Sequence, residues 1–118
     1  MAPKSKSGRV TIKTVAEESR NRPDAILCWT DFIALEVLSV ARELGISVPG
    51  DLAVVGYDNT SYCDLMQNAL TSVDQSGHVP GLQAARLLVE RIGSRTAAEH
   101  FIVPPRLVER ASSRHKAG

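Results

Sequence analysis

Two buried strands joined by an amphipathic helix are the first elements that the hydrophobic pattern predicts. A continuous apolar run over 25–29 is typical of a strand buried on both faces, and the run over 52–57 indicates a second such strand. Between them, apolar residues at helical spacing predict a helix over 32–44, which Gly45 ends in the conformation that a C-cap favours. Because a strand, a helix and a strand follow one another, we expect a βαβ unit with parallel strands.

The second half of the chain has a weaker pattern. A short strand is predicted over 70–73, after a polar loop, and an apolar stripe predicts a helix over 77–92. Beyond it, 101–103 and 107–108 indicate short strand pieces around two prolines, and the polar tail from residue 111 on is expected to fray. The predicted fold class is therefore α/β, a parallel sheet with flanking helices.

The N-terminal end differs from the rest of the chain in charge. The composition of residues 1–9, rich in Lys, Ser, Gly and Pro, predicts a disordered tail, and the apolar spacing over 11–19 predicts a short helix. The first 22 residues carry a net charge of +4 and the remaining residues a net charge of −3, within a total of +1. A basic arm on a mildly acidic body fits a polyanionic partner for the arm alone.

Length and composition exclude several classes of protein. A chain of 118 residues forms one small domain at most. Aromatic residues make up only 4%, which argues against a stacking platform for single-stranded nucleic acid. Two cysteines are too few for a disulfide scaffold or a four-ligand zinc site. Since the chain shows no secretory signal and no apolar run long enough for a membrane, we expect cytoplasmic residence.

The strand ends are the candidate binding site, because ligands of open parallel sheets bind beyond the C-terminal ends of the strands. The Asp58 carboxylate can accept two hydrogen bonds from a sugar diol or a purine edge, and Trp29 can stack on a sugar or base. Each residue also has an ordinary structural interpretation: Thr30 or Asp31 as a helix cap, Asp58 as part of a turn, Trp29 as core. Three polar strand ends at one edge are a stronger signal than any one of them: Trp29–Asp31, Tyr57–Asn59 and Gln75.

Signs of catalysis are weak. Asp31 and Asp58 form a carboxylate pair only if the fold brings them together, which the sequence does not fix. Cys28 lies in an apolar strand and is expected to be inert, whereas Cys63 lies in a loop where a reactive thiol is conceivable, without a basic neighbour in sequence. The histidines have no metal-ligand spacing, and no glycine loop for phosphate is present. We therefore expect no enzyme, no metal and no cofactor.

Taken together, the motifs resemble a known family. Over residues 22–113 the chain resembles the C-terminal part of the lactose-repressor (LacI/GalR) family of bacterial transcription regulators, through RPDAILCWTDFIALEVLSVARELGISVPGDLAVVGYDNT, ALTSVDQS and VPPRLVER. The N-terminal RVTIKTVAEES is similar to the first helix of that family's helix-turn-helix headpiece. The resemblance implies a headpiece remnant over 1–21, an incomplete periplasmic-binding-protein-like (type I) lobe over 22–113, and a tail over 114–118.

The family's DNA-binding part is represented only by its beginning. The recognition helix, the hinge helix and the N-terminal effector lobe do not follow the first helix, as though a large internal segment were deleted. Without a recognition helix we expect direct readout of a DNA site to be lost and nonspecific attraction to phosphates to remain. Thr11 and Lys13 match headpiece positions that contact the DNA backbone.

The resemblance also assigns residues to an effector cleft and to a dimer contact. Thr30, Asp58 and Gln75 match polar effector contacts, and Trp29 stands where members usually have a small residue, so a differently shaped pocket is expected. In the family, homodimers form partly through the helix after the TD motif and the loop after GYDN. The matching residues here are Leu35, Leu38, Arg42, Leu65 and Met66.

The helix predicted over 77–92 packs on the N-terminal lobe in family members. Its apolar stripe consists of Leu82, Leu88, Val89 and Ile92. Without that lobe the stripe is uncovered, and burial of each large apolar side chain is worth about 1.5–3 kcal/mol. We therefore expect the chain to oligomerise, to aggregate or to repack this helix on the remaining sheet.

Three functions follow from these observations. The first is a LacI-type regulator, or a fragment of one, that senses a small metabolite such as a sugar or nucleoside and controls DNA binding. The second is a fragment without ligand that dimerises with an intact relative, as a non-functional or dominant-negative chain. The third is a lobe of a sugar-binding transport protein, against which the missing signal sequence and the headpiece-like segment argue.

Overall fold

Among the residues that the structure describes, a four-stranded sheet and a helix that covers it form the body of the protein. The computed structural model describes residues 21–114, and the predicted tail 1–9, the predicted helix 11–19, and residues Thr11 and Lys13 lie outside the described residues. The strand order is β1-β2-β3-β4, with β1 and β2 parallel, β2 and β3 parallel, and β4 antiparallel to β3. The strands are β1 Ala25–Leu27, β2 Ala53–Tyr57, β3 Thr71–Asp74 and β4 Arg106–Val108. The predicted α/β class and the parallel βαβ unit are confirmed.

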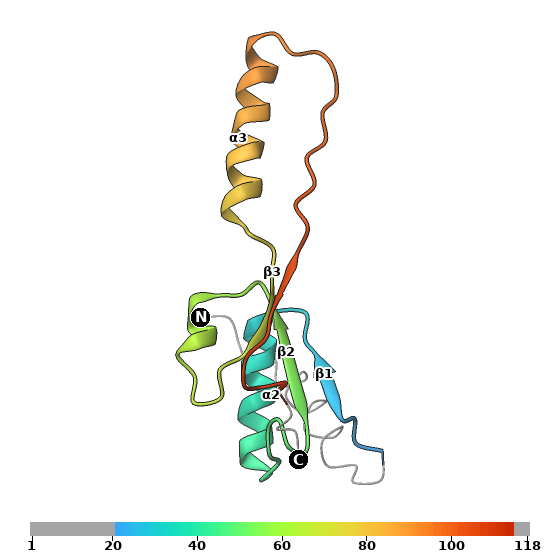
Figure 1. Ribbon diagram of the computed structural model, residues 1–118, viewed down its shortest axis with the longest axis vertical. Helices are drawn as coiled ribbons and strands as arrows, with labels where there is room; N and C mark the ends of the chain where they lie inside the picture. The colour runs from blue at the N-terminus through green and yellow to red at the C-terminus, as the bar shows by residue number, and fades with distance from the viewer. Residues whose placement is uncertain (1–20, 115–118) are drawn as a thin grey trace, which may run out of the picture.

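Helix α2 (Asp31–Glu43) connects β1 to β2 and lies against the sheet (Figure 1). Thr30 caps it in an extended conformation, with its Oγ1 accepting the Ile33 N–H at 3.2 Å. Its C-terminal end is followed by Gly45, whose φ of +69° is the left-handed conformation expected there. The predicted helix is therefore confirmed, and the cap is Thr30 rather than Asp31.

The core lies between α2, the sheet and the loop after β2. Ala34 and Val37 of α2 face Val54 of β2 and Leu70, which precedes β3, and all four are buried. A short 3-10 helix, η1 (Ser61–Asp64), closes one side of this core. This segment lies within the polar loop that the sequence predicted before the strand over 70–73.

Strand β1 differs from the prediction. The apolar run at 25–29 indicated burial on both faces, but Leu27 is 71% exposed and Trp29 is 86% exposed, while Cys28 between them is buried. The prediction of a doubly covered strand was wrong because no described element covers the outer side of β1. Trp29, two residues beyond the end of this edge strand, therefore lies in solvent.

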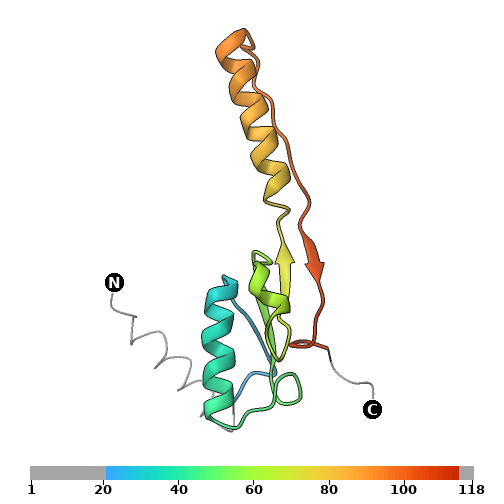
Figure 2. The ribbon, with the colours of Figure 1, turned by 90° about the vertical axis from the view of Figure 1, so that its left-hand side faces the viewer.

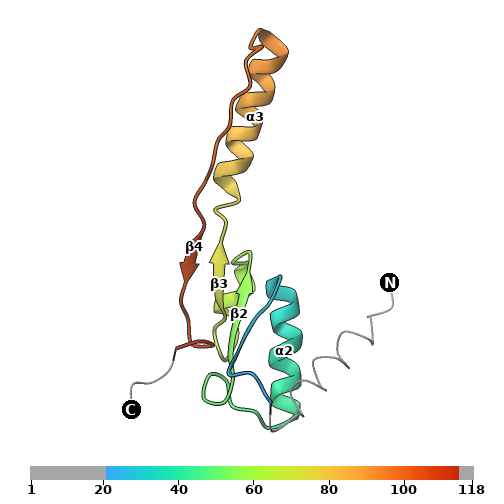
Figure 3. The ribbon, with the colours of Figure 1, turned by 90° about the vertical axis from the view of Figure 1, so that its right-hand side faces the viewer.

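Helix α3 (His78–Gly93) stands away from the sheet as an arm (Figure 1, Figure 2). No residue of α3 is buried, and the chain returns beside it to β4 (Figure 3). Arg86 of α3 forms ion pairs with Glu90 at 2.7 Å and with Glu99 of the returning segment at 2.8 Å. The strand piece predicted at 101–103 is not formed, because no strand lies beside that part of the arm.

The C-terminal segment is anchored rather than frayed. Ser112 is fully buried, its Oγ donates to Val54 O at 2.6 Å, and the same Oγ accepts the Thr71 N–H at 2.9 Å. The prediction of a frayed tail from residue 111 on was therefore wrong for the described part of it. A stretch of small polar residues is typical of a tail, but here Ser112 forms hydrogen bonds with main-chain groups of β2 and β3.

Candidate functional site

A hollow of about 610 Å³ opens at the ends of β1 and β2. The four residues predicted to bind an effector all line it, so the structure brings Trp29, Thr30, Asp58 and Gln75 together from three strand ends. The complete lining is Leu27, Cys28, Trp29, Thr30, Tyr57, Asp58 and Gln75. The parallel pairing of β1, β2 and β3 produces this convergence, because it places the C-terminal ends of all three strands at one edge.

Asp58 and Gln75 form the polar centre of the hollow. Gln75 Nε2 donates to Asp58 Oδ1 at 2.8 Å, which orients both side chains. Asp58 Oδ2 and Gln75 Oε1 have no protein donor among the described residues, so both remain available as acceptors. Two adjacent acceptors match a ligand that presents two adjacent O–H or N–H donors.

Trp29 supplies the apolar surface beside this pair. Its indole is 86% exposed and lines the hollow, so a ligand that covered it would gain burial and stacking. Thr30 uses its Oγ1 as an acceptor for the start of α2, which leaves its O–H to donate. The alternative interpretation of Trp29 as a core residue was wrong.

A second hollow adjoins the first and shares Tyr57, Asp58 and Gln75 with it. Its further walls come from the base of the arm: Gly77, Pro80, Phe101, Val103 and Pro105. The Asp58–Gln75 pair therefore borders both hollows, one beside the sheet and one beside the base of the arm.

The turn that carries Asp58 has unusual backbone geometry. Asp58 has a φ of +105° and Asn59 a φ of +50°, in the region that non-glycine residues rarely occupy. Hydrogen bonds from both main-chain amides hold this turn on β3, since Asp58 N donates to Val73 O and Asn59 N donates to Ser72 Oγ, each at 2.9 Å. Left-handed residues of this kind concentrate at functional sites.

Asp31 lies beneath the turn as a fully buried carboxylate. Its Oδ1 accepts Ser72 Oγ at 2.6 Å, and its Oδ2 accepts Thr60 N at 2.7 Å, Thr60 Oγ1 at 2.8 Å and Cys63 Sγ at 3.2 Å. Burial acts to raise the pKa of Asp31, but the hydrogen bonds from Ser72, Thr60 and Cys63 outweigh it, so the pKa lies below its usual value. Asp31 thus joins α2, η1 and β3.

The role of Asp31 was missed in sequence reasoning, which assigned it to a cap or to a carboxylate pair with Asp58. The structure binds its carboxylate entirely within the protein, so it is not part of the hollow's lining. The partners lie 29 to 41 residues away in sequence, and no local pattern connects them. The sequence offered one indication that Asp31 is structural, namely its position directly after the cap residue Thr30.

Neither thiol is placed for chemistry. Burial raises the pKa of Cys28 to about 11. Burial, followed by the hydrogen bond to Asp31, also raises the pKa of Cys63, which is fully buried. The suggestion that Cys63 is a reactive loop thiol was therefore wrong. Within residues 21–114 no group of three His, Cys, Asp or Glu side chains is arranged to hold a metal, and no helix is long and apolar enough to cross a membrane.

A separate groove of about 570 Å³ lies along α2. Of the residues predicted for a dimer contact, four line it: Leu35, Leu38, Arg42 and Met66. Leu65 lies outside the lining and is 83% exposed. The α2 groove therefore brings the helix and the loop after η1 into one surface, on different residues from the hollow.

Comparison with known proteins gives a consistent result. A family model described as a periplasmic binding protein-like domain matches residues 2–113. The repressor PurR of Pectobacterium carotovorum subsp. carotovorum is 38% identical over 94 residues, which are 79% of this chain and 28% of that protein. The chain thus spans less than a third of the length of this curated relative.

Solved structures agree with the sequence match. The complex of the transcriptional regulator CelR with cellobiose aligns with a TM-score of 0.80 and 34% identity, over 90% of this chain and 32% of that one. A LacI family transcriptional regulator from Lactobacillus casei with bound sucrose aligns with a TM-score of 0.77 and 27% identity, over 89% of this chain and 39% of that one.

Proposed function

This chain belongs to the LacI/GalR family of transcriptional regulators, within their effector-binding region, and on that premise we propose that it forms one wall of a cleft that senses a small metabolite, a sugar or a nucleoside. The observation that carries the proposal is the pairing of Asp58 with Gln75 beside the exposed indole of Trp29. Two oriented hydrogen-bond acceptors beside an indole are suited to a small ligand that has a ring and several hydroxyl or N–H groups.

The chemistry of such a ligand follows from the lining. A sugar offers vicinal hydroxyl groups as a pair of donors, and its C–H face is apolar enough to lie on an indole. A nucleoside offers the ribose diol or the base N–H groups, with a flat face for stacking. Two structural relatives support the first class, since CelR is solved with cellobiose and the Lactobacillus casei regulator with sucrose, and the second class rests on the lining alone.

In an intact regulator of this family we expect ligand occupancy to control DNA binding in the bacterial cytoplasm. The curated relatives are repressors rather than enzymes, which supports a regulatory role over a catalytic one. Thr11 and Lys13 remain the predicted contacts to the DNA backbone. For this chain alone we expect only salt-sensitive, nonspecific attraction to DNA from its basic N-terminal segment.

The single tryptophan makes ligand binding measurable. Because Trp29 is the one tryptophan of the chain and lines the hollow, a bound ligand is expected to quench or shift its fluorescence. We would titrate glucose, ribose, cellobiose, adenosine and guanosine separately. At least one is expected to give a saturable change. Absence of any change at millimolar concentrations, in fluorescence and in calorimetry, would contradict the proposal.

Variants assign the signal to the site. Asp58→Asn removes a carboxylate acceptor and is expected to weaken binding about tenfold or more, as loss of a charged hydrogen bond does. Asp24→Asn makes the same charge change at the opposite end of β1, outside the hollow, and is expected to leave affinity unchanged. Equal affinities for the two variants would place the ligand elsewhere.

A second copy of the chain is the partner that we propose for the α2 groove. Leu35 and Leu38 give the groove apolar walls, and Arg42 borders them. Leu35→Lys is expected to lower the dimer fraction in analytical ultracentrifugation, whereas Glu36→Gln on the same helix, outside the groove lining, is not. A dimer that survives Leu35→Lys unchanged would rule out this surface. A dimer without ligand binding would support the dimerising-fragment function instead.

A further inference from the structure

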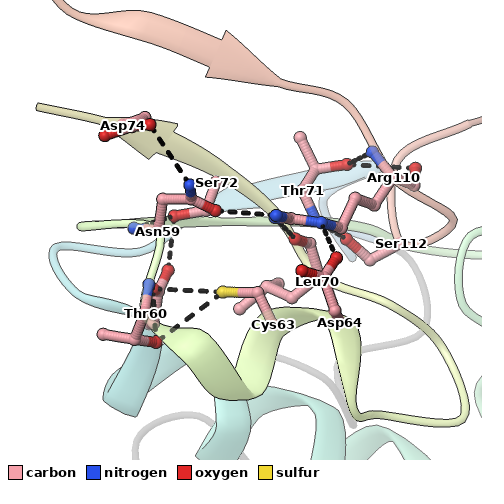
Figure 4. Close-up of polar contacts among 11 residues, drawn as sticks. Asn59, Thr60, Cys63, Asp64, Leu70, Thr71, Ser72, Asp74, Arg110 and Ser112 are labelled. Carbon is pink, nitrogen blue, oxygen red and sulfur yellow. Dashed lines mark hydrogen bonds and ion pairs between the residues drawn. The ribbon is translucent and has the colours of Figure 1, made fainter. Parts of the chain in front are cut away.

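Arg110, in the C-terminal segment after β4, reaches across to the turn that carries Asp58. Its guanidinium donates to three acceptors: Asn59 Oδ1 at 2.8 Å, Leu70 O at 2.8 Å and Asp64 Oδ1 at 2.6 Å (Figure 4). The side chain is only 13% exposed. A guanidinium held at three points in a mostly buried place has one orientation, so it is a fixed part of this region.

The backbone of Arg110 is fixed as well. Its N–H donates to Thr71 Oγ1 at 2.8 Å, and Thr71 Oγ1 donates in turn to Arg110 O at 3.1 Å. Thr71 belongs to β3, which also supplies the acceptor for Asp58 N and the hydroxyl that binds Asn59 N. Arg110 is therefore anchored to the same strand that supports the turn.

Asn59 is the residue through which Arg110 reaches the hollow. Non-glycine residues rarely adopt positive φ, although asparagine does so more readily than most, and contacts of its side chain hold Asn59 at +50°. Its side chain is held on both sides, with Oδ1 accepting Arg110 Nη2 and Nδ2 donating to Asp74 Oδ2 at 3.3 Å. The peptide between Asp58 and Asn59 then has little freedom to turn.

We propose that Arg110 is a positioning residue for ligand binding: by holding Asn59 in the left-handed conformation, it fixes the direction in which Asp58 presents its carboxylate to the hollow. The inference rests on the proposed function, since it takes the hollow as the ligand site. Arg110 itself does not line the hollow, so it acts only through Asn59. It lies 51 residues from Asn59 in sequence.

The fork of the guanidinium is essential to this role. Three acceptors from three different segments receive N–H groups of one planar side chain. A lysine ammonium lacks the planar fork and cannot serve all three with the same geometry. Arg110→Lys is therefore expected to impair binding nearly as much as Arg110→Gln, although it keeps the charge.

The experiment measures the affinities of cellobiose and guanosine for the full chain and its variants. We expect Arg110→Gln and Arg110→Lys to raise Kd about tenfold, the change that 1.4 kcal/mol corresponds to. Arg114→Gln is the matched control, because Arg114 lies in the same segment, is 63% exposed and, among residues 21–114, forms an ion pair only with Glu109, at 3.9 Å. Its Kd is expected to stay at the wild-type value, and equal effects of Arg110→Gln and Arg114→Gln would overturn the proposal.

A double-mutant cycle separates positioning from general stability. If Arg110 acts through Asn59, then Arg110→Gln loses its effect on Kd in an Asn59→Ala background, while its effect on melting temperature, which passes also through Leu70 and Asp64, persists. Full additivity of the two substitutions in Kd would show that the Asn59 contact is not the route and would overturn the proposal.

Hydrogen exchange at the Asn59 amide tests the same contact without any ligand. This amide donates to Ser72 Oγ, so loosening of the turn is expected to speed its exchange in Arg110→Gln but not in Arg114→Gln. If the wild type binds none of the five ligands named above while exchange accelerates as expected, the proposed function fails and the contact stands. If the exchange rate of the Asn59 amide does not change in Arg110→Gln, the positioning role is wrong, regardless of the measured Kd values.

Discussion

The carboxylate of Asp31 lies directly against the backbone of Gly56, so a Cβ at position 56 would overlap Asp31 Oδ1. The same Cβ would come within 3.0 Å of Leu70 Cδ2. The glycine in the middle of β2 therefore provides room for the first residue of α2 to approach the sheet, and through it for the hydrogen bonds that Asp31 receives from Ser72 and Thr60.

Gly56→Ala is expected to destabilise the protein by about 1–3 kcal/mol, as overpacking in a core does. The added methyl group has to displace either the Asp31 carboxylate or the strand. Thermal unfolding followed by circular dichroism measures the effect. Gly81→Ala in α3 is the control, since a Cβ there meets nothing within 4 Å and alanine favours a helix. A Gly56→Ala protein as stable as Gly81→Ala would contradict the overlap.

Asp31 is expected to make stability depend on acid pH. Its pKa is lower folded than unfolded, so its contribution is present above the unfolded value of about 3.9 and is lost as pH falls through the folded pKa. Asp31→Asn removes this contribution and places an amide donor where donors already converge, at a cost of at least about 2 kcal/mol near neutral pH. Denaturant unfolding at several pH values measures both effects.

The control for this experiment is Asp24→Asn, which changes the charge equally at an exposed position. We expect its unfolding free energy to fall in acid as that of the wild type does, whereas the profile of Asp31→Asn is flatter. Parallel profiles for Asp31→Asn and the wild type would mean that folding does not lower the pKa of the Asp31 carboxyl group.

Both thiols are expected to be protected in the native protein. Cys28 and Cys63 are buried, and the pKa of each is raised, so little thiolate is exposed to a disulfide reagent at mildly alkaline pH. Ellman's reagent is expected to titrate two thiols rapidly in concentrated guanidinium chloride and almost none without it. Fast reaction of one thiol in native buffer would show that its side of the core opens.

The arm is expected to drive self-association. Leu82, Val89 and Ile92 form an apolar stripe on α3, and each is at least 58% exposed. Val89→Glu is expected to lower the weight-average mass in sedimentation, without lowering the melting temperature of the sheet, because no residue of α3 is buried. Gln83→Glu adds the same charge on the opposite side of the helix and is the control. If both variants lower association equally, added charge rather than the stripe is responsible.

The position of α3 decides one of the predictions made for its apolar stripe. Three outcomes were expected for the uncovered stripe, namely oligomerisation, aggregation or repacking on the sheet. In the structure α3 does not repack, because β4 lies at the open edge of β3 and the chain leaves the sheet before the helix begins. Oligomerisation and aggregation stay as predictions.

Local pattern was enough for the elements and for the residues of the hollow. Apolar periodicity defined α2, β2 and β3, and Gly45 marked the end of α2. The rule for strand ends selected Trp29–Asp31, Tyr57–Asn59 and Gln75, of which all but Asp31 and Asn59 line the hollow. These features depend on backbone preferences and on the parallel connection of neighbouring elements, which a short stretch of sequence encodes.

Only the tertiary structure decided what supports the hollow. Asp31, Ser72 and Arg110 converge on one turn from segments up to 51 residues apart, and Ser112 is buried although it lies in a polar stretch. Exposure of Trp29 follows from the lack of a covering layer on β1 among the described residues. Burial and long-range hydrogen bonding are properties of the packed chain, since they depend on which distant backbone groups need partners, and no local pattern specifies that.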